Sequence, residues 1–137
     1  MTTRTKATIL VVDDEQGIRQ SFNMVLKNQF NVLMADSGKE AIELFTRNSV
    51  ALVLLDILLQ NENGLDLLAK FKELDPNAEI VMVSAIKDVK TAVKAIKLGA
   101  YDYLEKPFFV EDILKTVNRA MEKHQLVKEV AYLRVEL

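Results

Sequence analysis

Three aspartates at the ends of two apolar runs form the strongest chemical signal in this 137-residue chain. Asp13 and Asp14 follow the run Thr8–Val12, and Asp56 follows the run 51–55. Short, continuously apolar runs are typical of buried parallel strands, and ligands of an open α/β sheet bind at the carboxyl ends of its strands. Carboxylates crowded there would repel one another, and a divalent cation relieves that repulsion. The pattern predicts a Mg²⁺ site, with helix capping as the alternative role for each aspartate.

A serine and a lysine supply groups that would hold an anion beside this cation. Ser84 ends the apolar run Glu79–Ser84, and its hydroxyl can donate to an anion while the small Ala85 leaves room for the anion's oxygens. Lys106 is a compact cation, and Pro107 after it favours a tight turn, with a cis peptide bond as one option. The chain has only four glycines and no Gly-rich phosphate loop, which argues against a nucleotide-binding protein.

These groups together could transfer a phosphoryl group. A carboxylate can attack phosphorus and become an aspartyl phosphate, while metal, lysine and hydroxyl neutralise the equatorial oxygens. Asp56 is the candidate nucleophile because it stands alone, whereas the paired acids can serve the metal. No other nucleophile competes, since the chain has no cysteine and its single histidine, His124, lies in a distal helical segment. We expect His124 to be exposed to solvent or to lie at an interface.

Five apolar runs alternate with amphipathic segments, which predicts an α/β fold with a parallel sheet and helices on both faces. Helix starts are marked by Ser37, with Glu40 three residues later, and by Asp88. A polar loop is expected over 60–63. The expected strands are Thr8–Val12, Asn31–Ala35, 51–55, Glu79–Ser84 and 101–104, and the expected helices are 16–27, one that begins after Ser37, 64–74, 88–98 and 110–137.

Composition excludes several classes of protein. A formal net charge of -2 argues against a dedicated nucleic-acid surface, which usually needs a basic patch. The lack of cysteine rules out disulfides and thiolate metal sites. No apolar run approaches the length of a membrane span, and the short polar segment 1–6 has no apolar core of a signal peptide behind it. We therefore expect one soluble, cytoplasmic domain of ordinary size.

The ordered set of motifs resembles the receiver domain of two-component response regulators over residues 7–121. The resemblance rests on the paired acids, the lone acid, Ser84-Ala85 and the segment 103–108, in this order along the chain. The longer segment 99–108 is most similar to receivers of NtrC-type bacterial enhancer-binding activators. This likeness implies a (βα)5 doubly wound, flavodoxin-like sheet of strand order 2-1-3-4-5. Residues 7–121 would be the receiver domain and residues 122–137 a helical extension.

The resemblance also implies a role for each acid. Asp14 and the backbone carbonyl of Leu58 would bind Mg²⁺ together with Asp56, and Asp13 would act through a water on the metal. Asp56 would take its phosphoryl group from a phosphohistidine of a sensor histidine kinase. The domain would thus be a signalling module that catalyses only its own phosphorylation and dephosphorylation.

For the phosphorylated state, the resemblance implies that Ser84 and Lys106 hold the phosphoryl group. Tyr103 would be the aromatic switch, whose ring exchanges an exposed position for a buried one. The expected consequence is a change in homodimerisation and in the activity of an output domain with ATPase and DNA-binding functions. The receiver itself is expected to bind neither nucleic acid nor membrane.

One departure from the family pattern lies next to the nucleophile. Many receivers have Met-Pro three and four residues after it, where this chain has Leu59 and Gln60. Leucine approximates the volume of methionine, whereas glutamine leaves the loop 60–63 less rigid than proline would. Two other functions stay open: a receiver-like binding module that is never phosphorylated, and a Mg²⁺-dependent aspartyl phosphohydrolase. The hydrolase would need a general acid where this chain has Leu58.

The C-terminal segment changes its apolar register. A helix over 110–137 would be roughly 42 Å long at 1.5 Å per residue, whereas a domain of this size has a radius of gyration of about 13 Å. Its last turns must therefore leave the globule. The change of register lies between Met121 and Leu126 and predicts a dimerising coiled coil that leads to an output domain, with a frayed tail left by truncation as the alternative. The second register consists of Leu126, Val130, Leu133 and Leu137.

Overall fold

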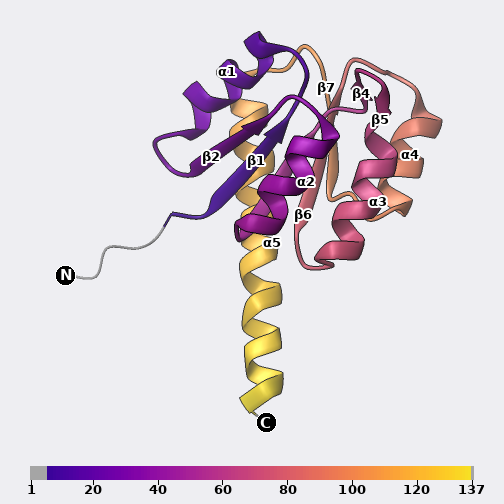
Figure 1. Cartoon of the computed structure of the whole chain (residues 1–137). Coiled ribbons are helices and arrows are strands. Elements are labelled where there is room, and N and C mark those ends of the chain that lie inside the picture. The colour runs from indigo at the N-terminus through magenta and orange to yellow at the C-terminus, as the bar shows by residue number, and fades with distance from the viewer. Residues whose placement is uncertain (1–5, 137) are drawn as a thin grey trace.

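The computed structural model describes residues 6–136, in which a parallel five-stranded sheet is covered by helices on both faces (Figure 1). The strand order β2-β1-β3-β6-β7 is the expected order 2-1-3-4-5, because the labels β4 and β5 belong to a separate hairpin. The sheet consists of β1 (Thr8–Val12), β2 (Asn31–Ala35), β3 (Val50–Leu55), β6 (Glu79–Ser84) and β7 (Asp102–Glu105). The helices are α1 (Gln16–Leu26), α2 (Gly38–Arg47), α3 (Gly64–Leu74), α4 (Val89–Lys97) and α5 (Val110–Glu136).

Successive residues of the central strands enter two separate cores, because side chains along a strand point to opposite faces. Leu10 and Val12 of β1 pack in the core covered by α2, α3 and α4. Ile9 and Val11 pack in the core covered by α1 and α5. Burial on both faces explains why β1 and β3 are continuously apolar instead of alternating.

Side-chain caps determine where several helices begin. The hydroxyl oxygen of Ser37 accepts a hydrogen bond from the Glu40 amide at 3.3 Å, and the carboxylate of Asp88 accepts one from the Lys90 amide at 3.0 Å. Both caps were predicted. Asn63 caps α3 in the same way, through a 2.9 Å bond from the Leu65 amide. These contacts orient the helices that follow the loops at the carboxyl edge of the sheet.

The expected polar loop at 60–63 is instead part of a small β-hairpin. The antiparallel strands β4 (Leu58–Leu59) and β5 (Glu62–Asn63) pair with each other, and a two-residue turn joins them. Asn61 in this turn has φ 65°, in the left-handed region that asparagine tolerates better than most residues. The prediction of a polar loop therefore holds for the turn, residues 60 and 61, and was wrong for residues 62 and 63, because strands of two residues are too short for a periodic pattern.

The C-terminal turns of α5 extend away from the sheet, as the length of the segment predicted (Figure 1). Leu126, Val130 and Leu133 are 60%, 48% and 58% exposed. Leu137 lies outside the described residues. Within residues 6–136, no helix combines the length and the apolar character needed to cross a membrane.

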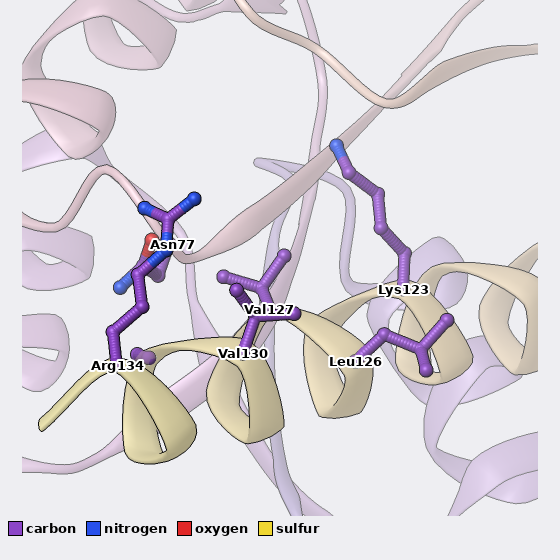
Figure 2. A pocket seen from close by; sticks show the side chains of 7 residues that line it. Asn77, Lys123, Leu126, Val127, Val130 and Arg134 are labelled. Atoms are coloured by element: carbon purple, nitrogen blue, oxygen red, sulfur yellow. The ribbon is translucent and has the colours of Figure 1, made fainter. Parts of the chain in front are cut away.

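The helix is anchored at the point where it leaves the globule. The ammonium of Lys123 lies 3.3 Å from the buried carboxylate of Glu79, and Nδ1 of His124 lies 3.0 Å from the carbonyl oxygen of Asn77. His124 is only 8% exposed, so the expectation of a solvent-exposed or interface histidine was wrong: the loop before β6 folds against this turn of α5. Figure 2 shows the adjacent groove, with Asn77 opposite side chains of α5.

Candidate functional site

Loops at the carboxyl edge of the sheet bring the predicted site residues together. Asp13 and Asp14 follow β1, Asp56 follows β3, Ser84 ends β6, and Lys106 follows β7. The backbone holds these loops in register: the Asp56 amide donates to the carbonyl oxygen of Val12 at 3.0 Å, and the Lys106 amide donates to that of Ser84 at 2.9 Å. Parallel strands all end at this edge, which is why residues far apart in sequence meet here.

The ammonium of Lys106 lies between two buried carboxylates. Its distance is 2.8 Å to Oδ2 of Asp13 and 3.1 Å to Oδ2 of Asp56. The two aspartates are 1% and 5% exposed. The peptide bond between Lys106 and Pro107 is cis, as the sequence allowed. One cation therefore faces two acids in surroundings that solvate charge poorly.

This arrangement changes the proton affinities of the site. Burial raises the pKa of Asp56 above its ordinary value, and the negative charge of Asp13 raises it further, against the opposing effect of Lys106. Burial lowers the pKa of Lys106, but the hydrogen bond and charge of Asp13 and the charge of Asp56 outweigh burial, so that the pKa is raised. Lys106 is thus a cation at neutral pH. The site has two buried carboxyl groups and only this one ammonium to compensate them.

Asp14 is exposed and forms a hydrogen bond with the hairpin. Its Oδ2 accepts a hydrogen bond from the backbone amide of Gln60 in the hairpin at 3.1 Å. The three carboxylates whose oxygens lie within 4.8 Å of one another belong to Asp13, Asp14 and Glu15, so Asp56 stands outside this group. Glu15 was not predicted as a site residue, and Gln60 was predicted only to loosen the loop 60–63, because neither belongs to the motif of acids, serine and lysine.

The donor set of the site fits a hard divalent cation. Carboxylate oxygens are the ligands that Mg²⁺ prefers, and Mg²⁺ typically binds through one or two carboxylates while it keeps several waters. Burial, and after it the negative charge of Asp13, raise the pKa of Asp56, so a cation bound here would stabilise its carboxylate form. The acidic cluster could therefore bind a metal ion, in agreement with the sequence-based expectation.

The backbone around Asp56 is tightly packed. The Leu58 amide donates to Oδ1 of Asp56 at 3.2 Å, and the Leu58 side chain is 60% exposed at the rim of the site. Gly64 opens α3 directly against this backbone: a Cβ atom there would overlap the carbonyl oxygen of Asp56 and come within 2.6 Å of the Cα of Ile57. Only glycine lets α3 and the backbone of Asp56 approach this closely.

Ser84 and Tyr103 both contact Ile86, on the loop between β6 and α4. The buried Ser84 accepts a hydrogen bond from the Ile86 amide at 3.2 Å. The Tyr103 hydroxyl donates to the Ile86 carbonyl at 2.7 Å, and its half-buried ring packs against the core on the α4 side. Burial raises the pKa of Tyr103. The ring therefore already lies inward in this structure, and not in the exposed position expected before phosphorylation, because the Ile86 carbonyl offers it a partner.

Residues 9–118 match the family described as the response regulator receiver domain. A putative NtrX-like response regulator of Rickettsia bellii is 37% identical over 124 residues, which cover 88% of this chain and 26% of that protein. The regulatory protein AtoC of Escherichia coli is 31% identical over 130 residues, which cover 94% of this chain and 28% of AtoC. The chain thus spans about a quarter of the length of these relatives.

Solved structures show the same likeness in three dimensions. The crystal structure of NtrX from Brucella abortus in complex with ADP has a TM-score of 0.88 at 37% identity, covering 94% of this chain and 30% of that one. A CheY-like receiver domain protein from Methanospirillum hungatei has a TM-score of 0.85 at 26% identity, covering 88% of this chain and 98% of that one. The second match corresponds to a receiver domain alone.

Proposed function

This chain belongs to the response regulator receiver family, with relatives of the NtrC type, and we propose that it is a switch in which Asp56 accepts a phosphoryl group from a phosphohistidine of a sensor histidine kinase. The observation that carries this proposal is the ammonium of Lys106 in contact with Asp56 at 3.1 Å, beside a cluster of acids that fits Mg²⁺. Nucleophile, cation and metal-binding oxygens are the parts that phosphoryl transfer needs.

In the transfer step, an Oδ atom of Asp56 attacks phosphorus while the bond from phosphorus to the histidine nitrogen breaks, and the nitrogen leaves with the bonding electrons. Lys106 can shift from the carboxylate to the incoming oxygens, which carry the negative charge. Asp13, Asp14, Asp56 and the backbone carbonyl of Leu58 would hold Mg²⁺, which when bound neutralises charge on the phosphoryl oxygens. The Leu58 amide, already bonded to Asp56, keeps the carboxylate oriented.

The phosphorylated state would act through Ser84. Its hydroxyl now accepts from the Ile86 amide and can donate to a phosphoryl oxygen on Asp56. Such a movement would shift the loop that carries Ile86, and the Tyr103 hydroxyl is bonded to the carbonyl of the same residue. We therefore assign Ser84 and Tyr103 to the switch, which would alter the surface formed by α4, β7 and α5.

We propose a domain division along α5. Residues 7–121 form the receiver domain in this proposal, and residues 122–137 are an extension that pairs with a second copy as a coiled coil. Its support is the apolar row of Leu126, Val130 and Leu133, which the receiver core leaves exposed. The extension would lead to an output domain that hydrolyses ATP and binds DNA. NtrC of Azospirillum brasilense is a DNA-binding transcriptional regulator, and NtrX of Brucella abortus was crystallised with ADP.

The receiver itself would bind neither DNA nor membrane and would act in the cytoplasm, where a sensor kinase presents its phosphohistidine. The only reaction that it catalyses would be the gain and loss of its own phosphoryl group. The hydrolase alternative lacks its general acid, since the residue two positions after Asp56 is the apolar Leu58.

Mass spectrometry after incubation with Mg²⁺ and acetyl phosphate tests this function. We expect one added phosphoryl group per chain, lost in Asp56→Asn and retained in the control Asp66→Asn, which alters an exposed aspartate of α3. A label that persists in Asp56→Asn, or that forms equally with a chelator present, would contradict the assignment. Continuous turnover of small phosphoesters would favour the hydrolase, and an intact site that takes no label would favour the unphosphorylated binding module.

A further inference from the structure

The hairpin turn reaches across the site to one of the metal-binding acids. The backbone amide of Gln60 donates to Oδ2 of Asp14 at 3.1 Å, a contact between residues 46 positions apart. The acceptor is a carboxylate, and hydrogen bonds to ionised acceptors are stronger than those between neutral groups. The contact therefore ties the hairpin to the loop after β1.

This contact depends on the residue type at position 60. Proline, the residue of many receivers at this position, has no backbone N–H and could not donate to Asp14. Glutamine restores the donor. Gln60 in place of proline therefore affects Asp14 as well as the hairpin itself.

The same contact occupies one oxygen of the Asp14 carboxylate. Asp14 is grouped with Asp13 and Glu15, and its Oδ2 is occupied by the Gln60 amide. In the proposed function, Asp14 shares a cation with Asp56. A cation that binds through Oδ2 of Asp14 would take the oxygen to which the Gln60 amide donates, so the cation and the amide would compete for it.

We infer that Gln60 is a positioning residue whose backbone amide competes with Mg²⁺ for the carboxylate of Asp14, so that binding of the cation releases the hairpin turn. This inference rests on the proposed function, since it assumes that Asp14 and Asp56 share a cation. By linkage, the hairpin contact lowers the affinity for the cation by the same factor by which the cation weakens the contact.

The rest of the hairpin is attached independently, which limits the release to the turn. Leu59 is buried in the core on the α2 side. The Glu62 carboxylate lies against Gly38 in the first turn of α2, where a Cβ atom would overlap it. A carboxylate is stabilised near the N-terminus of a helix. Loss of the Gln60 contact therefore frees residues 60 and 61 without unfolding β4 and β5.

Isothermal titration with MgCl₂ of the wild-type chain, Gln60→Pro and Gln60→Ala tests the inference. Gln60→Pro removes the N–H, whereas Gln60→Ala changes the side chain and keeps it. The turn should accept proline at position 60. Gln60 does not have a positive φ, since among residues 6–136 only Asn61 and Gly99 do. Proline is also favoured directly before a residue of positive φ, such as Asn61, in a type II turn. We expect Gln60→Pro to bind Mg²⁺ at least about fivefold more tightly, since fivefold is the factor for one ordinary hydrogen bond and a bond to a carboxylate is stronger. Gln60→Ala should match the wild type.

Equal or weaker binding by Gln60→Pro would overturn the inference, because the amide would then be neutral or helpful to the cation. A second measurement needs no variant: on titration of the wild type with MgCl₂, the Gln60 amide proton should move upfield and exchange faster with water, while the Glu40 amide, bonded to Ser37, stays unchanged. Slower exchange of the Gln60 amide would overturn the inference while leaving the Mg²⁺ site intact. A wild-type chain that binds no Mg²⁺ would instead contradict the metal site of the proposed function, and the inference with it.

Discussion

The ammonium of Lys106 lies 3.1 Å from the carboxylate of Asp56, although 50 residues separate them in the sequence. The same ammonium lies 2.8 Å from Asp13, so it is shared by two buried acids that repel each other. A transferred phosphoryl group would bring further negative charge to this point. Lys106 is therefore in position to stabilise both the resting site and the reaction.

Replacement of Lys106 by methionine should affect stability and phosphorylation together. Without its cation, the buried pair Asp13 and Asp56 loses a hydrogen-bonded partner, and we expect the free energy of unfolding to fall by about 1–3 kcal/mol in the presence of a chelator. Mg²⁺ should restore part of this loss, while labelling by acetyl phosphate stays slow. Urea denaturation with and without Mg²⁺ measures the effect. Lys70→Met, at an exposed position of α3, is the control and should change neither quantity.

The raised pKa of Asp56 predicts how stability depends on pH. Because burial and Asp13 raise the pKa of the folded carboxyl, the folded chain binds more protons than the unfolded chain above the ordinary pKa of 3.8. The free energy of unfolding should therefore decrease, through this group, as the pH rises from 3.8 through the raised pKa, and then level off. Asp56→Asn should remove this decrease and be more stable than the wild type at pH 7 without metal. Denaturation at a series of pH values checks this, and parallel curves for the two proteins would contradict it.

The apolar rim of the site should make the phosphorylated state long-lived. Hydrolysis needs a water in line with the Asp56 phosphate, and the rim residues Leu58 and Ile86 offer no polar group to orient it. The double variant Leu58→Asn with Ile86→Glu should lose its phosphoryl group faster, as followed by the decay of the mass label after removal of the donor. Met24→Asn, at an exposed position of α1, serves as the control. Unchanged or slower decay in the double variant would exclude this explanation.

Tyr103 should transmit the signal without taking part in the chemistry. Its hydroxyl contacts the Ile86 carbonyl and not the acids, so Tyr103→Ala should be labelled at Asp56 like the wild type but show a weaker effect of phosphorylation on self-association. Tyr103→Phe keeps the ring and loses one hydrogen bond, and we expect a cost of about 1 kcal/mol in stability. Sedimentation before and after phosphorylation measures the response. If Tyr103→Ala responds as fully as the wild type, the signal leaves by another route.

The extension of α5 should drive self-association. Burial of Leu126, Val130 and Leu133 against a second copy could contribute about 1.5–3 kcal/mol each before the entropic cost of association. Ending the chain at Lys123 should weaken dimerisation, but it would also remove His124, whose ring contacts Asn77. Substitution of the three apolar residues by serine avoids this loss. Lys128→Ser with Glu129→Ser is the matched control on the same helix. Sedimentation that shows the same oligomer in all variants would move the interface to the globular surface.

Much of the fold could be predicted from short-range patterns. The apolar runs of β1 and β3 follow from burial on both faces of the sheet, and the caps at Ser37 and Asp88 are contacts within three residues. The parallel order of the sheet then places the acids after β1 and β3 at one edge. Asp13, Asp14, Asp56, Ser84 and Lys106 could be assigned to one site for this reason. Local sequence is enough to predict a feature when the contacts that determine it lie close together in the sequence, or when only a few arrangements of the strands are possible.

Only the tertiary structure decided the contacts between distant loops. The short strands of the hairpin carry no pattern of their own, and the bond from Gln60 to Asp14 exists because two loops 46 residues apart meet over the site. The inward position of Tyr103 depends in the same way on the Ile86 carbonyl, and the burial of His124 on Asn77. Each of these contacts has a backbone N–H or C=O as one partner, and nearly every residue type provides such a group, so residue identity alone does not reveal which of them will meet. Their formation depends on how the sheet and its helices bring separate segments together.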